Sequence, residues 1–302
     1  MIYLKPRCGL RNRIRAISSA LALARTISGP AEAVRVCVVW ADEGGMRVPF
    51  RDLFVSSGAF DLVDFGDERM PELVSRFSPE NPHYLGHDHD RSREQLLNSL
   101  KTVRRMPDED WYIETCCSFW DVLDYAWMKP VPSVETEVAQ WISKMGKRRV
   151  GIHVRRTDNV KSRAHSPLCA FKKVVWRELE NNPDVTFYLS SDDECVKRQM
   201  RKQFGDLILV RDGLPARRDD GGVAQGLVDL LLLAHTGKVY GSYWSSFSTS
   251  AAALGGVPFE YVLGTRAGNA CRMALFTVRK KLLDVVRRFR SKAHRWQVCV
   301  LG

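Results

Sequence analysis

Polar side chains follow an apolar run in the stretch VGIHVRRTDN, residues 150–159. The run predicts a buried strand, and its carboxyl end carries His153, Arg155, Arg156 and Asp158. In open parallel sheets, ligands bind at the carboxyl ends of strands, where loops lead into helix N-termini. Because a guanidinium presents a fixed fork of N–H donors that suits phosphate oxygens, the arginines indicate a site for a phosphate-bearing ligand. The alternative is that they form salt bridges on a domain surface.

Two later strand ends also carry polar groups. SSDDE ends one expected strand and begins a helix, which places Asp192 and Asp193 at the junction. GSYWSSFSTS places Ser245 and Ser246 at another helix start, where backbone N–H groups favour an anion. Helix capping explains each motif equally well, since Ser and Asp are preferred N-cap residues.

Two further features add polar groups to the candidate site. Asp229 lies inside the apolar run LVDLLLL, where an unpaired carboxylate is costly, so we expect it to have a polar partner or a ligand. The loop PRCGLRN near the N-terminus contributes Gly9, which permits close approach of the backbone to a ligand, and Asn12 at a helix start.

The scaffold predicted for these residues is α/β. MIYLK, GLRNRIRAISSALALAR and VRVCVVWADE predict a strand, an amphipathic helix and a buried parallel strand. The pattern is less regular from about 44 to 145, and after GKRR strands and helices alternate again. Such repeats predict a second parallel α/β domain. We therefore expect two Rossmann-like domains, at residues 1–147 and 148–266, followed by a basic helix at 267–302.

Positive charge is concentrated in that last segment. The chain of 302 residues has a net charge of +11, and residues 267–302 hold nine Lys or Arg against a single acid, Asp284. A basic amphipathic helix of this kind lies on an anionic membrane surface or packs across the domains with its basic face solvated. No RNA-binding module is recognisable, so nucleic acid is not an expected partner.

Other features of the composition predict a cytoplasmic protein. The longest apolar stretch, LVDLLLLAH, is too short to span a bilayer, and the first residues do not resemble a signal peptide. Membrane contact, if any, is then peripheral and made by the basic helix. The eight cysteines show neither CxxC pairs nor metal-ligand spacing, which predicts reduced thiols and no zinc.

Four motifs in order resemble the fucosyltransferase superfamily with the GT-B fold, in which two Rossmann-like domains face each other across a cleft. They are HVRRTD, YLSSDD, the aspartate in an apolar helix, and the serines of WSSFS sixteen residues later. The patterns are similar to those of α-1,6-fucosyltransferases acting on N-glycan cores and of rhizobial enzymes that fucosylate chitin oligosaccharides. GLRNRIRAISSALALAR followed by VVWADE is similar to the glycine–asparagine loop that opens the first domain of related enzymes.

The resemblance implies a glycosyltransferase with GDP-fucose as donor. It implies that Arg155 binds the β-phosphate and supports the departing diphosphate, with His153 and Arg156 shaping the same strand end. The first domain is then the acceptor side and the second binds the nucleotide sugar. It further implies that Asp229 and either Asp192 or Asp193 contact the guanine or the ribose. Ser245 and Ser246 would contact the diphosphate, and Gly9 and Asn12 would close over the nucleotide.

The implied chemistry is an inverting transfer that needs no metal or other cofactor, because cationic side chains and a helix N-terminus can stabilise the leaving group. It also needs a base for the acceptor hydroxyl. Core α-1,6 enzymes carry a glutamate where this chain has Arg163, and a lysine where it has Asn159. The base is therefore open, although the motif makes Asp158 a catalytic candidate beside Arg155. The full set of candidate bases is Asp158, Asp42, Glu43, His165 and Glu194.

Three functions follow from these patterns. The first is an inverting fucosyltransferase that transfers fucose from GDP-fucose to an oligosaccharide or glycoconjugate acceptor. The second keeps the GT-B fold but uses another nucleotide sugar. The third, prompted by the missing glutamate and the basic tail, is a non-catalytic nucleotide- or glycan-binding protein at a membrane surface.

Overall fold

A computed structural model describes most of the chain. The described residues are 1–29, 33–42, 46–87, 98, 109–120, 124–157, 159–213 and 220–265. The basic helix expected at 267–302 and the candidate bases Asp158 and Glu43 lie outside the described residues.

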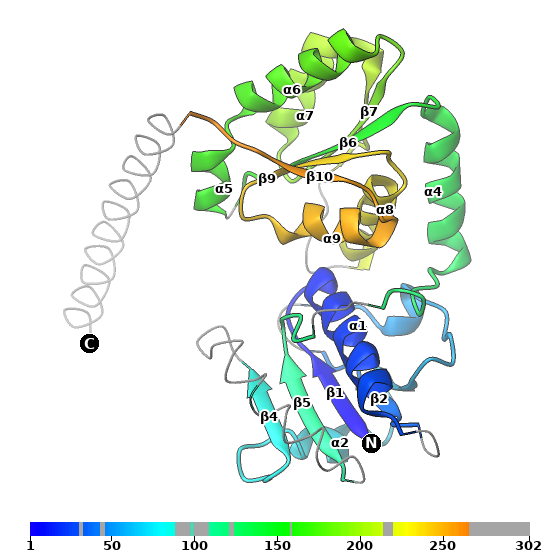
Figure 1. Ribbon diagram of the computed structural model, residues 1–302. Helices are drawn as coiled ribbons and strands as arrows, with labels where there is room; N and C mark the ends of the chain where they lie inside the picture. The colour runs from blue at the N-terminus through cyan, green and yellow to red at the C-terminus, as the bar shows by residue number, and fades with distance from the viewer. Residues whose placement is uncertain are drawn as a thin grey trace, which may run out of the picture. The chain divides into compact units, whose positions relative to one another are not determined.

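The chain divides into two compact units, and each contains a five-stranded parallel sheet (Figure 1). One unit comprises residues 1–144 with 215–232, and the other comprises residues 145–214 with the chain from 233 onward. The two α/β sheet systems predicted from the sequence are confirmed.

The first sheet has the strand order β3-β2-β1-β5-β4, and every neighbouring pair is parallel. Its strands are β1 (Ile2–Pro6), β2 (Val36–Val39), β3 (Asp61–Val63), β4 (Tyr84–His87) and β5 (Trp111–Thr115). Its helical elements are α1 (Leu10–Ile27), the 3₁₀ turn η1 (Phe50–Asp52), α2 (Met70–Ser75) and α4 (Pro132–Lys144).

The core of this unit is partly aromatic. Trp40, Phe50, Phe54 and Trp127 are at most 1% exposed, and their rings contact one another in edge-on, tilted and stacked arrangements. The helix α1 buries an apolar face that recurs every three to four residues, as the sequence predicts. This packing fixes α1 against β1 and so positions the loop between them.

The second sheet has the strand order β10-β9-β6-β7-β8, again all parallel. Its strands are β6 (Arg149–Val154), β7 (Thr186–Ser191), β8 (Ile208–Leu209), β9 (Val239–Ser242) and β10 (Phe259–Val262). The accompanying helices are α5 (Val160–His165), α6 (Leu168–Asn181), α7 (Glu194–Phe204), the 3₁₀ turn η2 (Gly205–Leu207), α8 (Asp220–Ala234) and α9 (Ser246–Gly255).

Helices cover both faces of the second sheet. Figure 1 shows α6 and α7 on one face and α9 on the other. The central strand β6 is consequently buried from Val150 to Val154, as expected for a parallel strand. The end of α8 packs so closely on α9 that a Cβ at Gly255 would overlap the backbone of Ala234. Rigid packing of this kind holds the strand ends in place.

Candidate functional site

The loop after β6 is fastened to the end of β7 by Asp192. Its Oδ1 accepts from the backbone N–H of Arg156 at 2.7 Å, and its Oδ2 accepts from the Thr157 hydroxyl at 2.6 Å. The same Oδ2 lies 3.0 Å from Nη1 of Arg155. The side chains of Arg155 and Asp192 are 24% and 12% exposed, so the ion pair is largely shielded from water. Three successive loop residues therefore converge on one carboxylate.

The environment of Asp192 keeps it ionised. Burial alone would raise the pKa of Asp192, but the hydrogen bond from Thr157, the charge of Arg155 and the N–H of Arg156 together lower this pKa below its ordinary 3.8. The carboxylate is a permanent negative partner at neutral pH. It can hold the guanidinium of Arg155 in one orientation at the strand end.

His153 joins the end of β6 to the start of α9. It is 4% exposed, its Nδ1 lies 3.4 Å from Oγ of Ser245, and its ring contacts Phe247 with the centroids 4.8 Å apart. Burial, and then the charge of Arg155, lower the pKa of His153 far below its ordinary 6.5, although Asp192 acts in the opposite direction. The imidazole is therefore neutral and serves as a hydrogen-bonding and packing group.

The turn after β9 is held by α5 and by the residues that cap its two ends. The Ser162 hydroxyl donates to the carbonyl of Tyr243 at 2.6 Å, and the N–H of Tyr243 donates to the Ser166 hydroxyl at 2.7 Å. Asn159 Nδ2 donates to the carbonyl of Trp244 at 3.0 Å, and its Oδ1 caps α5. The residue that replaces the lysine of the similar family thus fastens one strand-end loop to another.

The start of α9 remains suited to an anion. Ser245 is the N-cap residue, but its side chain makes no capping hydrogen bond and is turned toward His153 instead. Ser246 is the first residue of this helix. Trp244, just before the cap, is 59% exposed and adopts a left-handed conformation with φ of 59°. Lys161 Nζ lies 4.1 Å from the centroid of its ring, which adds a cation to this region.

Asp193 has the capping role that the sequence left open. Its Oδ1 accepts from the backbone N–H groups of Cys195 at 2.7 Å and Val196 at 3.3 Å, at the N-terminus of α7. Among the described residues of the loop that carries Arg155, the contacts are with Asp192 and not with Asp193. A ligand role for either carboxylate stays a prediction.

In the other unit, a buried arginine organises the loop between β1 and α1. Arg13 is fully buried, donates from Nε to the carbonyl of Cys8 at 3.0 Å and from Nη1 to the carbonyl of Ala41 at 2.9 Å. Its guanidinium carbon lies 4.7 Å from the Trp40 ring centroid. Arg13 was missed among the sequence candidates, although its place on the apolar face of the helix, four residues before Ile17, could have revealed it.

Gly9, in the same loop, is not required by the fold of the described residues. Its φ of −70° is open to any residue, and an added Cβ would meet nothing within 4 Å. This space agrees with the expected close approach of a ligand to the backbone. Asn12 accepts from Arg11 through Oδ1 and donates its N–H to the carbonyl of Gly9 at 2.9 Å.

The remaining candidates are distributed as follows. Asp229 is 6% exposed in α8, on the part of that helix that belongs to the first unit with Gly9 and Asn12. Glu194 pairs with the buried Lys197 at 3.0 Å, and the ring of His165 contacts Tyr243 with the centroids 4.7 Å apart. The structure brings five predicted residues together at one sheet edge: His153, Arg155, Arg156, Asp192 and Ser245.

No three His, Cys, Asp or Glu side chains within the described ranges gather as a set of metal ligands. No helix in that part of the chain has the length and apolar character needed to cross a membrane.

Comparison with known proteins shows the fold. No protein-family model and no curated protein sequence matches the chain, but solved structures do. The NodZ α-1,6-fucosyltransferase co-crystallized with GDP is 17% identical, with 84% of this chain and 92% of that chain covered and a TM-score of 0.56. NodZ has also been solved from Bradyrhizobium.

Two other fucosyltransferases are similar. A variant of Arabidopsis thaliana FUT1 in complex with GDP is 14% identical, with 88% of this chain and 71% of that chain covered and a TM-score of 0.61. POFUT1 in complex with GDP is 11% identical, with 87% and 98% covered and a TM-score of 0.52. The chain therefore has the GT-B fold of fucosyltransferases, as the order of the four motifs predicted.

Proposed function

We propose that this protein is a glycosyltransferase that takes fucose from GDP-fucose and transfers it to a glycan or glycoconjugate acceptor. The observation that carries the proposal is the Arg155–Asp192 pair at the carboxyl edge of a parallel sheet, beside the start of α9. Strand ends of this kind bind phosphate-bearing ligands in parallel α/β folds. Structures with the same fold contain GDP, which supports a guanine nucleotide as the ligand.

In this proposal Arg155 supports the leaving diphosphate. Because a guanidinium has several N–H donors in one plane, Asp192 can fix it through Nη1 while other N–H groups approach a phosphate oxygen. The backbone N–H groups at the start of α9, near Ser245 and Ser246, favour the same negative charge. Neutral His153 contributes shape and a hydrogen bond rather than charge.

The proposed reaction is a single inverting displacement. The acceptor oxygen bonds to the anomeric carbon of fucose, the bond from that carbon to the β-phosphate oxygen breaks, and GDP departs with the electron pair. A base takes the acceptor proton, and Asp158 is our first candidate. Since cationic groups and a helix N-terminus can balance the charge on GDP, the mechanism requires no metal. Gly9, Asn12 and Asp229 are assigned contacts with the nucleotide, as the family resemblance implies.

A donor screen tests the proposal. The purified chain is incubated with GDP-fucose, GDP-mannose and UDP-linked sugars together with chitin oligosaccharides or N-glycans, and nucleotide release is measured. We expect GDP release only from GDP-fucose with an acceptor, and a rise in melting temperature with GDP but not with UDP. Protection by UDP and release from a UDP-sugar would assign another donor. If no donor turns over and GDP gives no protection, the chain is not a glycosyltransferase of this class.

A further inference from the structure

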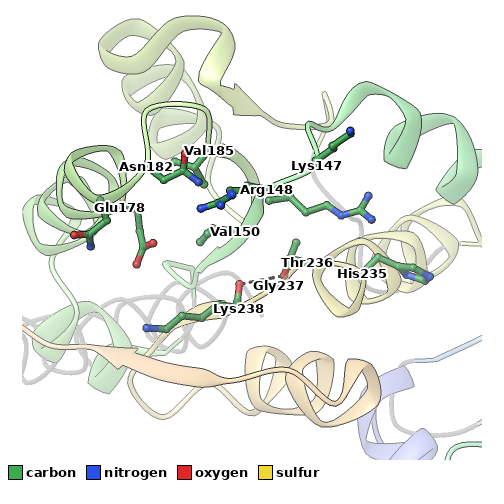
Figure 2. Close-up of a pocket in the computed structure, with 12 residues that line it drawn as sticks. Lys147, Arg148, Val150, Glu178, Asn182, Val185, His235, Thr236, Gly237 and Lys238 are labelled. Carbon is green, nitrogen blue, oxygen red and sulfur yellow. Dashed lines mark hydrogen bonds between the residues drawn. The ribbon is translucent and has the colours of Figure 1, made fainter.

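A second pocket lies in the same unit as Arg155, where the strands of the second sheet begin. It has a volume of about 610 Å³ and is formed by the start of β6, the end of α6 and the segment that precedes β9 (Figure 2). Because all strands are parallel, this amino edge is opposite the carboxyl edge that carries Arg155. The lining residues that carry charge are Lys147, Arg148, Arg149, Glu178 and Lys238, and Asn182 adds a neutral amide.

Three consecutive cations line the pocket without compensation. The side chains of Lys147, Arg148 and Arg149 make no hydrogen bond or ion pair with any residue that the structure describes. Lys147 and Arg148 are exposed and Arg149 is half-buried. Like charges this close in sequence repel one another, and the acid in the described lining, Glu178, forms no ion pair with them. An anion that binds beside them relieves this repulsion.

The acid in the lining is already engaged. Glu178 accepts from the Tyr240 hydroxyl through Oε1, and Lys238 Nζ donates to Glu260 at 2.9 Å. Figure 2 shows Glu178 and Lys238 on one side of Val150, with Lys147 and His235 on the other. Lys238 therefore has an acidic partner of its own, whereas Lys147, Arg148 and Arg149 have none among the described residues.

The lining is rigid and rich in donors. The carbonyl of Arg148 accepts from the N–H of Thr186 at 2.9 Å, and the carbonyl of Arg149 accepts from the N–H of Gly237 at 2.9 Å. The cationic side chains therefore start from a fixed backbone. Asn182 uses Oδ1 to accept from the N–H of Asp184 at 3.1 Å, so its NH₂ group is not used in that bond. Such a lining suits a ligand that carries several acceptor oxygens.

We propose that this pocket binds a phosphate-bearing anion, at a site separate from that of the sugar donor. The competing explanation is that the cations only balance the C-termini of α6 and α8, which end beside the pocket. Each helix end carries about half a negative charge, so the two together offset about one of the three unpaired cations. With the carboxylate of Glu178 counted as well, about one net positive charge remains to attract an anion, and a phosphate group supplies both charge and acceptors.

The test measures binding of pyrophosphate to the full chain by calorimetry. The variant Lys147→Gln/Arg148→Gln is compared with the control Lys172→Gln/Lys173→Gln, which removes the same charge from α6 outside the pocket. We expect the first variant to lose about tenfold or more in affinity for one pyrophosphate, and the control to behave as the wild type. Added salt should weaken pyrophosphate binding to the wild type and to the control, because salt screens the attraction between the anion and the cations.

A second arm distinguishes a free phosphate compound from a phospholipid headgroup. Flotation is measured with phosphatidylcholine vesicles with or without phosphatidic acid. Weaker flotation of the pocket variant than of the control on phosphatidic acid assigns a headgroup, and loss of pyrophosphate binding alone assigns a free anion. Equal behaviour of the two variants in both arms overturns the proposal. Protection by GDP should be the same in all three proteins, so a failed donor screen leaves this test unaffected.

Discussion

At the carboxyl edge of the second sheet the guanidinium of Arg155 lies 3.0 Å from a carboxylate, whereas at the amino edge Lys147 and Arg148 have no acidic partner among the described residues. The two edges therefore use positive charge differently. A paired and shielded guanidinium has one orientation, which a reaction with a defined geometry requires. Unpaired exposed cations attract anions without fixing them, which is enough for binding.

The two edges also differ in how far their cationic groups are removed from water. At the carboxyl edge the pKa of His153 is lowered chiefly by burial, so one potential cation is kept neutral beside Arg155. At the amino edge the cations are exposed or half-buried and stay charged at little cost. The comparison predicts that substitutions at the carboxyl edge change catalysis and stability, and that substitutions at the amino edge change only anion binding.

The largest effect is expected for Arg155→Ala. Because we propose that Arg155 supports the leaving diphosphate, its removal should lower kcat for GDP release from GDP-fucose by about a hundredfold or more. Arg201→Ala is the control, because Arg201 also pairs with an aspartate, Asp212, at 2.7 Å but on α7. Arg155→Lys should recover a small part of the rate, since it restores charge without the planar fork. Full activity of Arg155→Ala would contradict the claim that the carboxyl edge uses its positive charge for catalysis.

A smaller loss is expected for Asp192→Asn. The amide can still accept the N–H of Arg156, but it no longer holds the guanidinium by charge, so kcat per folded molecule should fall about tenfold. Asp212→Asn, at an 87% exposed aspartate, should leave kcat unchanged. A lower melting temperature with unchanged kcat would show that Asp192 stabilises the loop but does not position Arg155.

The sheet edges could be predicted because their strands are apolar runs that end abruptly. VGIHV and VTFYL lead directly into the polar residues at 155 and 192, and the βαβ pattern then places those residues at one edge. The contact between Arg155 and Asp192 itself could not be predicted, since it depends on the register of β6 with β7. The same is true of Arg13, whose partners Cys8 and Ala41 are brought to it by β1 and β2.

The region from 44 to 145 was harder to interpret because its strands carry charge inside the sheet. β1 and β5 pair so that Lys5 is opposite Glu114, and the two side chains form a buried ion pair at 3.0 Å. The Tyr84 hydroxyl on β4 donates to the same carboxylate at 2.7 Å. In the sequence alone, a charged residue in a short strand resembles a loop residue. The ion-pair partner that explains it lies about a hundred residues away in the chain.

The pH dependence of stability tests the buried state of His153. Its folded pKa lies far below the ordinary 6.5, so as pH falls below 6.5 the unfolded chain takes up a proton that the folded chain does not. Stability should therefore fall with decreasing pH, by about 1 to 2 kcal/mol at this residue between pH 6.5 and pH 5. Urea unfolding of wild type and His153→Asn measures the difference. Equal slopes against pH in both proteins would mean that His153 protonates freely in the fold.

The smallest effect on stability is expected at the amino edge. Lys147→Gln/Arg148→Gln removes two exposed cations that have no partner among the described residues, so the free energy of unfolding should change by no more than about 0.5 kcal/mol. A slight increase in the free energy of unfolding would fit this expectation too, because the variant removes repulsion between neighbouring cations. The free energies of unfolding of this variant and of Asp192→Asn are both measured in urea and compared. Asp192→Asn is the contrasting case because it leaves a shielded guanidinium without its counter-charge. A large destabilisation of Lys147→Gln/Arg148→Gln would mean that these cations hold the fold together, and the amino edge would then resemble the carboxyl edge in using its charge for structure.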